Sequence, residues 1–234
     1  LRMSRAPAGN DNRRPGAAPG YVELISTSNF SFLRGGSHPE ELALTAAGLG
    51  LGGCGLTDRN SFAGVVRAYV ALRDGEGRPP GFRGLVGTRL GFSDKTPDIV
   101  AYPTDRAAYG RLCKLLSEAN LRGEKGAPQL RADDLLRGFS HNVVPIEAED
   151  FTQGQLFILI VDESDWALSE RVLAALAARA PGRVWVAGIC RFAGNDRARL
   201  NRLAALGRAH GAPLIASNDV LYHEPGRRVL QDVI

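Results

Sequence analysis

The sequence has few of the residues from which disulfide frameworks and metal clusters are built. Its 234 residues include three cysteines and four histidines. Cys54, Cys113 and Cys190 lie far apart without a C-x-x-C spacing, which argues against a disulfide framework or a zinc cluster. Scattered cysteines of this kind are typical of the reducing cytoplasm, which is therefore the expected location.

Long hydrophobic runs are also missing. No apolar run approaches the roughly 20 residues that a helix needs to cross a bilayer, so we expect no membrane partner. Residues 1–20 contain arginines but not the apolar core of a secretory signal.

Positive charge is in slight excess. The formal net charge is +4, which permits contact with nucleic acid without requiring it. Residues 1–20 hold four arginines against one aspartate, together with several prolines and glycines. We predict that this segment is a disordered basic tail, and an arm that attracts phosphates is the alternative.

From Tyr21 onwards, strand and helix patterns alternate along the chain. We expect the first strand around residues 21–24 and six more at 51–57, 85–92, 99–102, 155–161, 184–189 and 213–217. Ser37, Thr104 and Ser164 are expected to cap helices, with Tyr69 and Tyr109 in the core.

These seven steps predict a single α/β domain over residues 21–234, with a parallel sheet and outer helices. An open, doubly wound sheet is the alternative. No G-x-G-x-x-G motif follows the first strand, which disfavours a dinucleotide-binding fold.

The segment 21–35 reads YVELISTSNFSFLRG. It resembles the opening motif of the PHP domain at the N-terminus of bacterial DNA polymerase III α-subunits. The shared framework consists of Tyr21, Val22, Leu24, Phe30, Ser31, Leu33 and Gly35. The resemblance implies a distorted seven-stranded (β/α) barrel of PHP type.

Three further segments resemble landmarks of the same family: 56–60 (LTDRN), 102–109 (YPTDRAAY) and 216–222 (ASNDVLY). Together with FSFLRG they are most similar to the error-prone, translesion branch. The resemblance implies the N-terminal fragment of a DNA-directed DNA polymerase that acts after DNA damage. The catalytic carboxylates of nucleotidyl transfer and their Mg²⁺ would belong to a downstream domain. The implied partners are the remainder of the polymerase chain, DNA, and other replication or mutasome proteins.

The positions that match the family's metal site have lost most of their ligands. These vestigial positions are Ile25, Thr27, Asp58, Arg59, Arg89, Asp219 and Leu221. Arginine is a permanently charged donor and does not bind metals, and two arginines would repel a dication. We therefore predict no catalytic residue, no metal and no other cofactor in this domain. His223, two residues after Leu221, is the one histidine that could substitute for a lost ligand.

Three functions remain open: a catalytically silent structural module of the polymerase, a metal-dependent phosphoesterase or 3′–5′ proofreading exonuclease, and a basic module that contacts DNA through Arg59 and Arg89. Asp58 and Asp219 should cap turns after their strands or pair with these arginines. Two facing carboxylates need a cation between them. We therefore predict that Arg59 or Arg89 lies within about 4 Å of Asp58 or Asp219.

Overall fold

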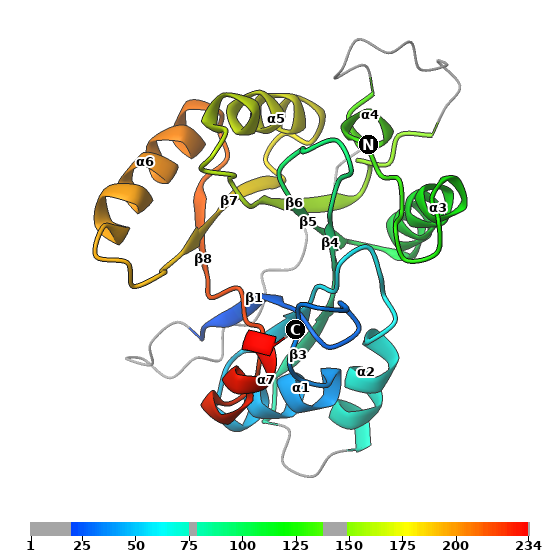
Figure 1. The fold of residues 1–234 in the computed structure, drawn as a ribbon, viewed down its shortest axis with the longest axis vertical. Coiled ribbons are helices and arrows are strands. Elements are labelled where there is room, and N and C mark those ends of the chain that lie inside the picture. Colours follow the sequence, from blue (N-terminus) through cyan, green and yellow to red (C-terminus); the bar gives the residue numbers. More distant parts are fainter. Residues whose placement is uncertain (1–19, 75–78, 138–148, 234) are drawn as a thin grey trace, which may run out of the picture.

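A computed structural model of the protein describes residues 20–74, 79–137 and 149–233, in which eight strands form two sheets (Figure 1). The first sheet is parallel and has the order β1-β2-β3, with β1 (Val22–Ser26), β2 (Gly53–Leu56) and β3 (Arg83–Val86). The second has the order β4-β5-β6-β7-β8, with β4 (Thr88–Leu90), β5 (Ile99–Pro103), β6 (Gln155–Leu159), β7 (Val184–Ile189) and β8 (Leu214–Ser217). The predicted tail lies outside the described residues up to position 19, so its disorder stays a prediction.

The α/β class is confirmed, but the predicted seven-stranded barrel is not what the structure has. The strand predicted at 85–92 is divided at Gly87, where a Cβ atom would lie 2.6 Å from the ring of Tyr102. Among the described residues, the β-bridges between the ends of the first sheet and the second are isolated ones, Ser26 to Val220 and Arg59 to Arg89. The result is two sheets and not one closed barrel.

The prediction of an all-parallel sheet is also wrong, because β5 runs antiparallel to both β4 and β6. The segment 91–98 between β4 and β5 explains the first reversal. A parallel crossover needs about a dozen residues or more, and this segment is shorter. The pairs β6–β7 and β7–β8 are parallel, as predicted.

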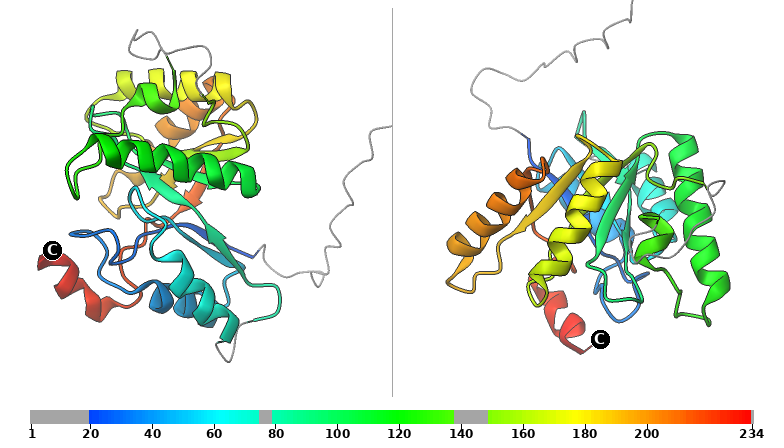
Figure 2. Two further views of the ribbon diagram at one scale, coloured as in Figure 1. Left: turned by 90° about the vertical axis from the view of Figure 1, so that its right-hand side faces the viewer. Right: turned by 90° about the horizontal axis from the view of Figure 1, so that it is seen from above.

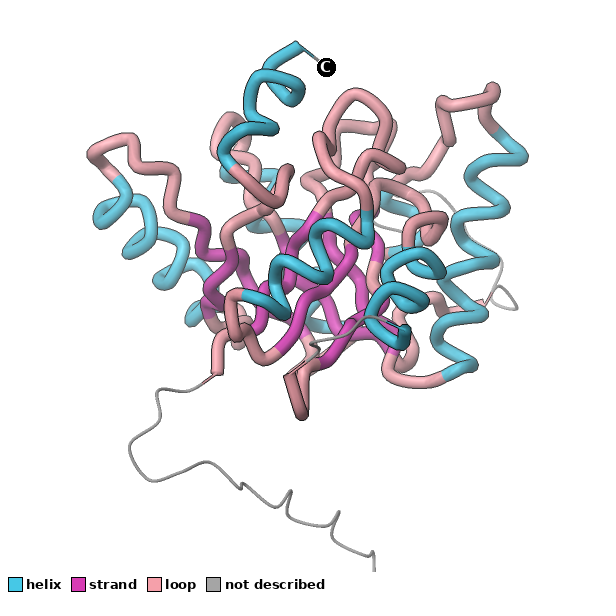
Figure 3. The backbone as a smooth tube through the Cα atoms, turned by 90° about the horizontal axis from the view of Figure 1, so that it is seen from below, coloured by secondary structure: helices cyan, strands magenta, loops and turns pink. Residues whose placement is uncertain are grey.

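The helices divide between the two sheets. Figure 1 shows α1 (Pro39–Gly48), α2 (Val65–Asp74) and α7 (Arg228–Val233) beside the three-stranded sheet. The helices α3 (Arg106–Arg122), α4 (Ala132–Leu135), α5 (Trp166–Arg179) and α6 (Asp196–Ala209) lie beside the five-stranded sheet. A 3-10 turn, η1 (Pro225–Arg227), precedes α7. The two views in Figure 2 show the same division, and Figure 3 shows the strands inside a surround of helices.

Aspartates begin two of the long helices. The carboxylate of Asp105 accepts a hydrogen bond from the N–H of Ala108 at 2.7 Å, and that of Asp165 accepts one from Leu168 at 2.9 Å. The predicted caps Thr104 and Ser164 are therefore each one residue too early. The capping position of α1 is His38 in place of Ser37, and its N–H donates to Glu41 Oε2 at 2.8 Å. A carboxylate is a strong acceptor for the free N–H groups of a first helical turn.

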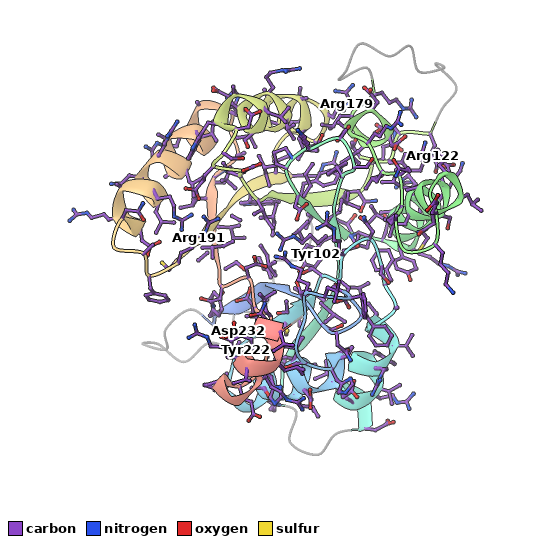
Figure 4. The ribbon with its side chains drawn as sticks, viewed as in Figure 1. Tyr102, Arg122, Arg179, Arg191, Tyr222 and Asp232 are labelled. Atoms are coloured by element: carbon purple, nitrogen blue, oxygen red, sulfur yellow. The ribbon has the colours of Figure 1, made fainter. Side chains whose placement is uncertain are left out.

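An apolar layer joins the inner faces of the two sheets. Its buried members are Ile25, Val100, Tyr102, Ile158, Ala187 and Ile189. Tyr102 lies at the centre of the molecule (Figure 4), and its hydroxyl donates a hydrogen bond to the carbonyl of Leu24 in β1. A second, larger cluster lies under the outer helices and includes the fully buried Leu112, Leu115, Phe157, Leu173 and Leu176.

The predicted core positions Tyr69 and Tyr109 are wrong: 61% and 38% of their surface is exposed. Helix α2 instead turns Ala68 and Leu72 inwards, one turn apart, into a cluster with residues of α1. The small side chain of Ala68 packs in the cluster that α1 and α2 share, while Tyr69 beside it faces solvent. No described helix is both long and apolar enough to cross a membrane.

Candidate functional site

The segments that follow β1, β2 and β8 meet beside β4 and the start of β5. Backbone hydrogen bonds fix this arrangement, with Thr27 donating to Val220 at 2.8 Å and Arg89 donating to Asp58 at 3.1 Å. These contacts bring together most of the sequence-predicted site positions, as expected for the ends of neighbouring strands.

Arg89 forms the centre of the site. Its side chain is 7% exposed, and its guanidinium contacts two carboxylates. Nε donates to Asp98 Oδ2 at 2.6 Å and Nη1 donates to Asp219 Oδ1 at 2.9 Å. The predicted pairing of an arginine with Asp58 or Asp219 is therefore confirmed, for Arg89 and Asp219.

A second arginine, Arg34, reaches Asp219 from the loop after β1. Its Nη2 lies 3.3 Å from Asp219 Oδ2. Burial and the neighbouring Arg89 lower the pKa of Arg34, whereas Asp219 and Asp98 act to raise it. Two guanidinium groups and two carboxylates thus balance one another in charge. We call these four residues, Arg34, Arg89, Asp98 and Asp219, the arginine–carboxylate network.

Asp58 belongs to a different arrangement. It is 2% exposed and accepts three hydrogen bonds of 2.8 Å, from the N–H and hydroxyl of Ser28 and from the hydroxyl of Ser31. Burial raises the pKa of Asp58, and the bonds from Ser31 and Ser28 act in the opposite direction. Asp58 therefore fixes the loop after β1, which is the turn-capping role that the sequence left open beside an ion pair.

The remaining vestigial positions offer little to a metal. Ile25 is fully buried in the layer between the sheets, and Leu221 is half-buried. Thr27 is also fully buried, and its hydroxyl has no hydrogen-bond partner in the described part of the chain. Arg59 is exposed, and no ion pair involving it occurs within residues 20–74, 79–137 and 149–233.

His223 makes its contacts with the start of α1. Its Nδ1 lies 2.8 Å from the hydroxyl of Ser37 and 3.7 Å from Glu41 Oε2. These contacts give it a structural role beside α1, and none of them involves Asp219.

A metal centre of the kind found in phosphoesterases does not fit these residues. The described residues contain no group of three or more His, Cys, Asp or Glu side chains that could hold a metal ion. The carboxylates of Asp98 and Asp219 both face the buried guanidinium of Arg89. A permanent cation that donates to both carboxylates competes directly with a dication for the same oxygens.

Sequence reasoning missed two residues of the site, Asp98 and Arg34, and gave no role to a third, Glu23. Asp98 precedes β5, whose antiparallel direction brings its first residue to this end of the sheet, and Arg34 lies inside the recognised opening motif. Glu23 in β1 is 3% exposed. Its carboxylate accepts hydrogen bonds from the N–H of Ile25 at 2.8 Å, the hydroxyl of Ser217 at 2.5 Å and the N–H of Asn218 at 3.1 Å. The signal available in the sequence was an acidic residue within the first predicted strand. In the structure, Glu23 links this strand to the end of β8.

Comparisons with known proteins agree with this fold. The PHP domain model matches residues 24–180, so the chain belongs to the PHP domain family. An error-prone DNA polymerase of Caulobacter vibrioides is 47% identical over 220 residues, which are 92% of this chain and 18% of that protein. An error-prone DNA polymerase of Brucella abortus is 46% identical over 215 residues, 92% of this chain and 19% of that protein. The chain thus spans about a fifth of the length of these relatives.

Two solved structures share the fold at low sequence identity. An amidohydrolase from Chromobacterium violaceum has a TM-score of 0.57 and 17% identity, with 88% of this chain and 89% of that chain covered. A candidate metal-dependent phosphoesterase from Bifidobacterium adolescentis has a TM-score of 0.56 and 16% identity, with coverage of 89% and 90%. Identities this low establish the fold alone.

Proposed function

We propose that this chain is the PHP module of an error-prone DNA polymerase and that its role there is structural. The polymerase relatives support the first part of the proposal. The observation that carries the second part is Arg89, whose buried guanidinium contacts both Asp98 and Asp219. An arginine in this position supplies fixed positive charge to the carboxylates without supplying a Lewis acid.

The polymerase as a whole would be a DNA-directed nucleotidyltransferase that copies damaged templates in the cytoplasm. Its catalytic carboxylates and Mg²⁺ would lie in the part of the relatives that this chain does not span. Its partners would be the remainder of the polymerase chain, DNA, and other replication or mutasome proteins. The PHP module would contribute a stable platform, whose strand ends would be held by ion pairs in place of a bound metal.

Metal analysis tests the proposal directly. The 234-residue chain is purified, incubated with Zn²⁺ or Mn²⁺, desalted, and its metal content is measured by mass spectrometry. Hydrolysis of bis(p-nitrophenyl) phosphate and of end-labelled single-stranded DNA is followed in parallel. We expect less than stoichiometric metal and no hydrolysis. Two or more bound metal ions, or metal-dependent removal of 3′ nucleotides, would establish the phosphoesterase or proofreading exonuclease instead.

A second test separates a structural role from a catalytic one. Arg89→Ala is introduced into the full-length polymerase that carries this module. The structural role predicts a lower melting temperature and less soluble protein, with unchanged nucleotide incorporation per folded molecule. A lower incorporation rate with an unchanged melting temperature would contradict it.

A further inference from the structure

A cleft of about 510 Å³ lies next to the arginine–carboxylate network. It is lined by residues 30–34 after β1, by residues 59–61 after β2, and by Asn120, Gly126 and Pro128 from the end of α3 and the loop beyond it. Its size is within the range of clefts that bind small ligands. None of its described lining residues is an aspartate or a glutamate, whereas Arg34 and Arg59 are both present.

Two aromatic side chains at the cleft face solvent. Phe30 is 41% exposed and Phe32 is 86% exposed, and Leu33 beside them is 62% exposed. Leu33 has φ +58°, a left-handed conformation that is uncommon for a residue with a branched side chain. Large apolar groups held outwards in a strained loop are typical of a binding surface.

The loop that carries these aromatics is held in place from below. Ser28 and Ser31 donate hydrogen bonds to the buried carboxylate of Asp58. The carbonyl of Ser31 accepts the N–H groups of Arg34 and Gly35, at 3.1 and 3.2 Å. The former metal-site aspartate therefore fixes the loop before any ligand arrives, which reduces the entropy lost on binding.

The cation that remains available is Arg59. Its guanidinium lies against Gly91, where a Cβ atom would be 2.3 Å from Nε, and its backbone N–H donates to the hydroxyl of Ser31 at 2.8 Å. Arg34 is partly balanced by Asp219. Arg89, expected from the sequence as a second DNA contact, is almost fully buried and paired with two carboxylates. Arg89 is therefore not free to contact a phosphate, whereas the exposed Arg59 is.

We propose that this cleft binds single-stranded DNA, with bases stacked on Phe30 and Phe32 and a phosphate paired with Arg59. The inference rests on the proposed polymerase function for the choice of DNA. Exposed aromatic faces beside an unbalanced cation are the combination by which proteins bind single strands. A duplex keeps its bases stacked inside, so it offers no base face to Phe32. An apolar protein partner would not require the arginine or the absence of acidic residues.

Fluorescence anisotropy of the 234-residue chain tests the proposal, with EDTA present so that no metal contributes. The probe is a labelled oligo(dT) of about 16 nucleotides, and the comparison is a duplex of equal length. We expect Phe32→Ala to weaken binding of the single strand by about 10-fold, since one stacked base contributes on the order of 1–3 kcal/mol. We expect a similar loss for Arg59→Ala, because this change removes the cation that pairs with a phosphate. Gly91→Ala should also weaken binding, because the added methyl group displaces the Arg59 guanidinium while the net charge stays the same.

The matched controls are Phe192→Ala and Arg208→Ala. Phe192 is 93% exposed after β7, and Arg208 is exposed in the last turn of α6. If these controls weaken binding as much as Phe32→Ala and Arg59→Ala, or if the chain prefers the duplex, the proposal is overturned. An absence of single-strand binding by the parent chain overturns it as well and leaves the loop as a protein-binding surface. Because metal content and hydrolysis are measured separately, these outcomes do not depend on whether the structural role is correct.

Discussion

Arg89 joins the two edges of the five-stranded sheet by pairing with Asp219. Arg89 lies in edge strand β4, and Asp219 follows the opposite edge strand, β8. The two charged groups are 2.9 Å apart, although 130 residues separate them in the sequence. This ion pair therefore links one edge of the sheet to the segment that follows its other edge.

Arg89→Ala should destabilise the chain by about 3 kcal/mol. The change leaves Asp98 and Asp219 as neighbouring, partly buried carboxylates without their main cation, and breaking such pairs typically costs on the order of 3–5 kcal/mol. Both carboxylates retain about a fifth of their exposure, so the lower end of that range applies. Urea unfolding measures the difference. Arg208→Ala, an exposed change of the same type, should stay within about 0.5 kcal/mol of the parent. Equal losses in the two variants would show that the network adds no stability.

The pH dependence of the unfolding free energy should reveal the raised pKa of the Asp58 carboxyl group. Its pKa in the folded chain is raised above the usual 3.8, chiefly by burial. The folded state therefore binds the proton more tightly than the unfolded state, and this contribution is present at low pH and lost as pH rises through the folded pKa. Compared with Asp58→Asn, the parent should gain relative stability as pH falls from neutral towards 3.8. Unfolding free energies of both chains across that window measure the effect. A parent that loses relative stability on acidification would show that the serine hydrogen bonds outweigh burial.

Two leucines on α3 offer a test of the core. Leu116 is 6% exposed in the main apolar cluster, whereas Leu121 on the same helix is 86% exposed. Leu116→Ala should cost about 2–5 kcal/mol of unfolding free energy, because it removes buried methyl groups and leaves a cavity. Leu121→Ala makes the same chemical change at the surface and should cost little. Thermal and urea unfolding of both variants compare them, and similar values would mean that α3 is not packed as described.

Two of the free cysteines, Cys54 and Cys190, should react with thiol reagents at very different rates. Cys54 is buried, its Sγ lies 3.4 Å from the hydroxyl of Ser26, and burial raises the pKa of its thiol to about 11. Roughly one Cys54 side chain in a thousand would be the reactive thiolate at about pH 8. We expect Cys190, which is exposed, to be alkylated rapidly and Cys54 only after unfolding. Peptide mass spectrometry of samples taken over time measures the order, and rapid labelling of Cys54 in the folded chain would contradict the packing around β2.

The sequence predicted best those features that depend on residues close together in the chain, such as single strands and the opening motif. The strand predicted at 155–161 is present at Gln155–Leu159, and the opening motif located the loop that Asp58 fixes. Pairings between distant elements were harder to predict. The division at Gly87 depends on the ring of Tyr102, and the contact of Arg89 with Asp98 depends on the reversed direction of β5. These features come from tertiary packing, so no spacing along the chain encodes them.

The hydrogen bonds of Glu23 have a consequence for how the chain folds during synthesis. Glu23 in β1 binds the hydroxyl of Ser217, which is 194 residues further along the chain. At about 5–20 residues per second, a ribosome needs roughly 10–40 s to make that intervening stretch. During that interval β1 lacks its β8 partner, and Glu23 has only the contacts that Tyr21 and Ile25 in its own segment supply. The Glu23–Ser217 hydrogen bond can therefore form only after β8 has been synthesised, long after β1.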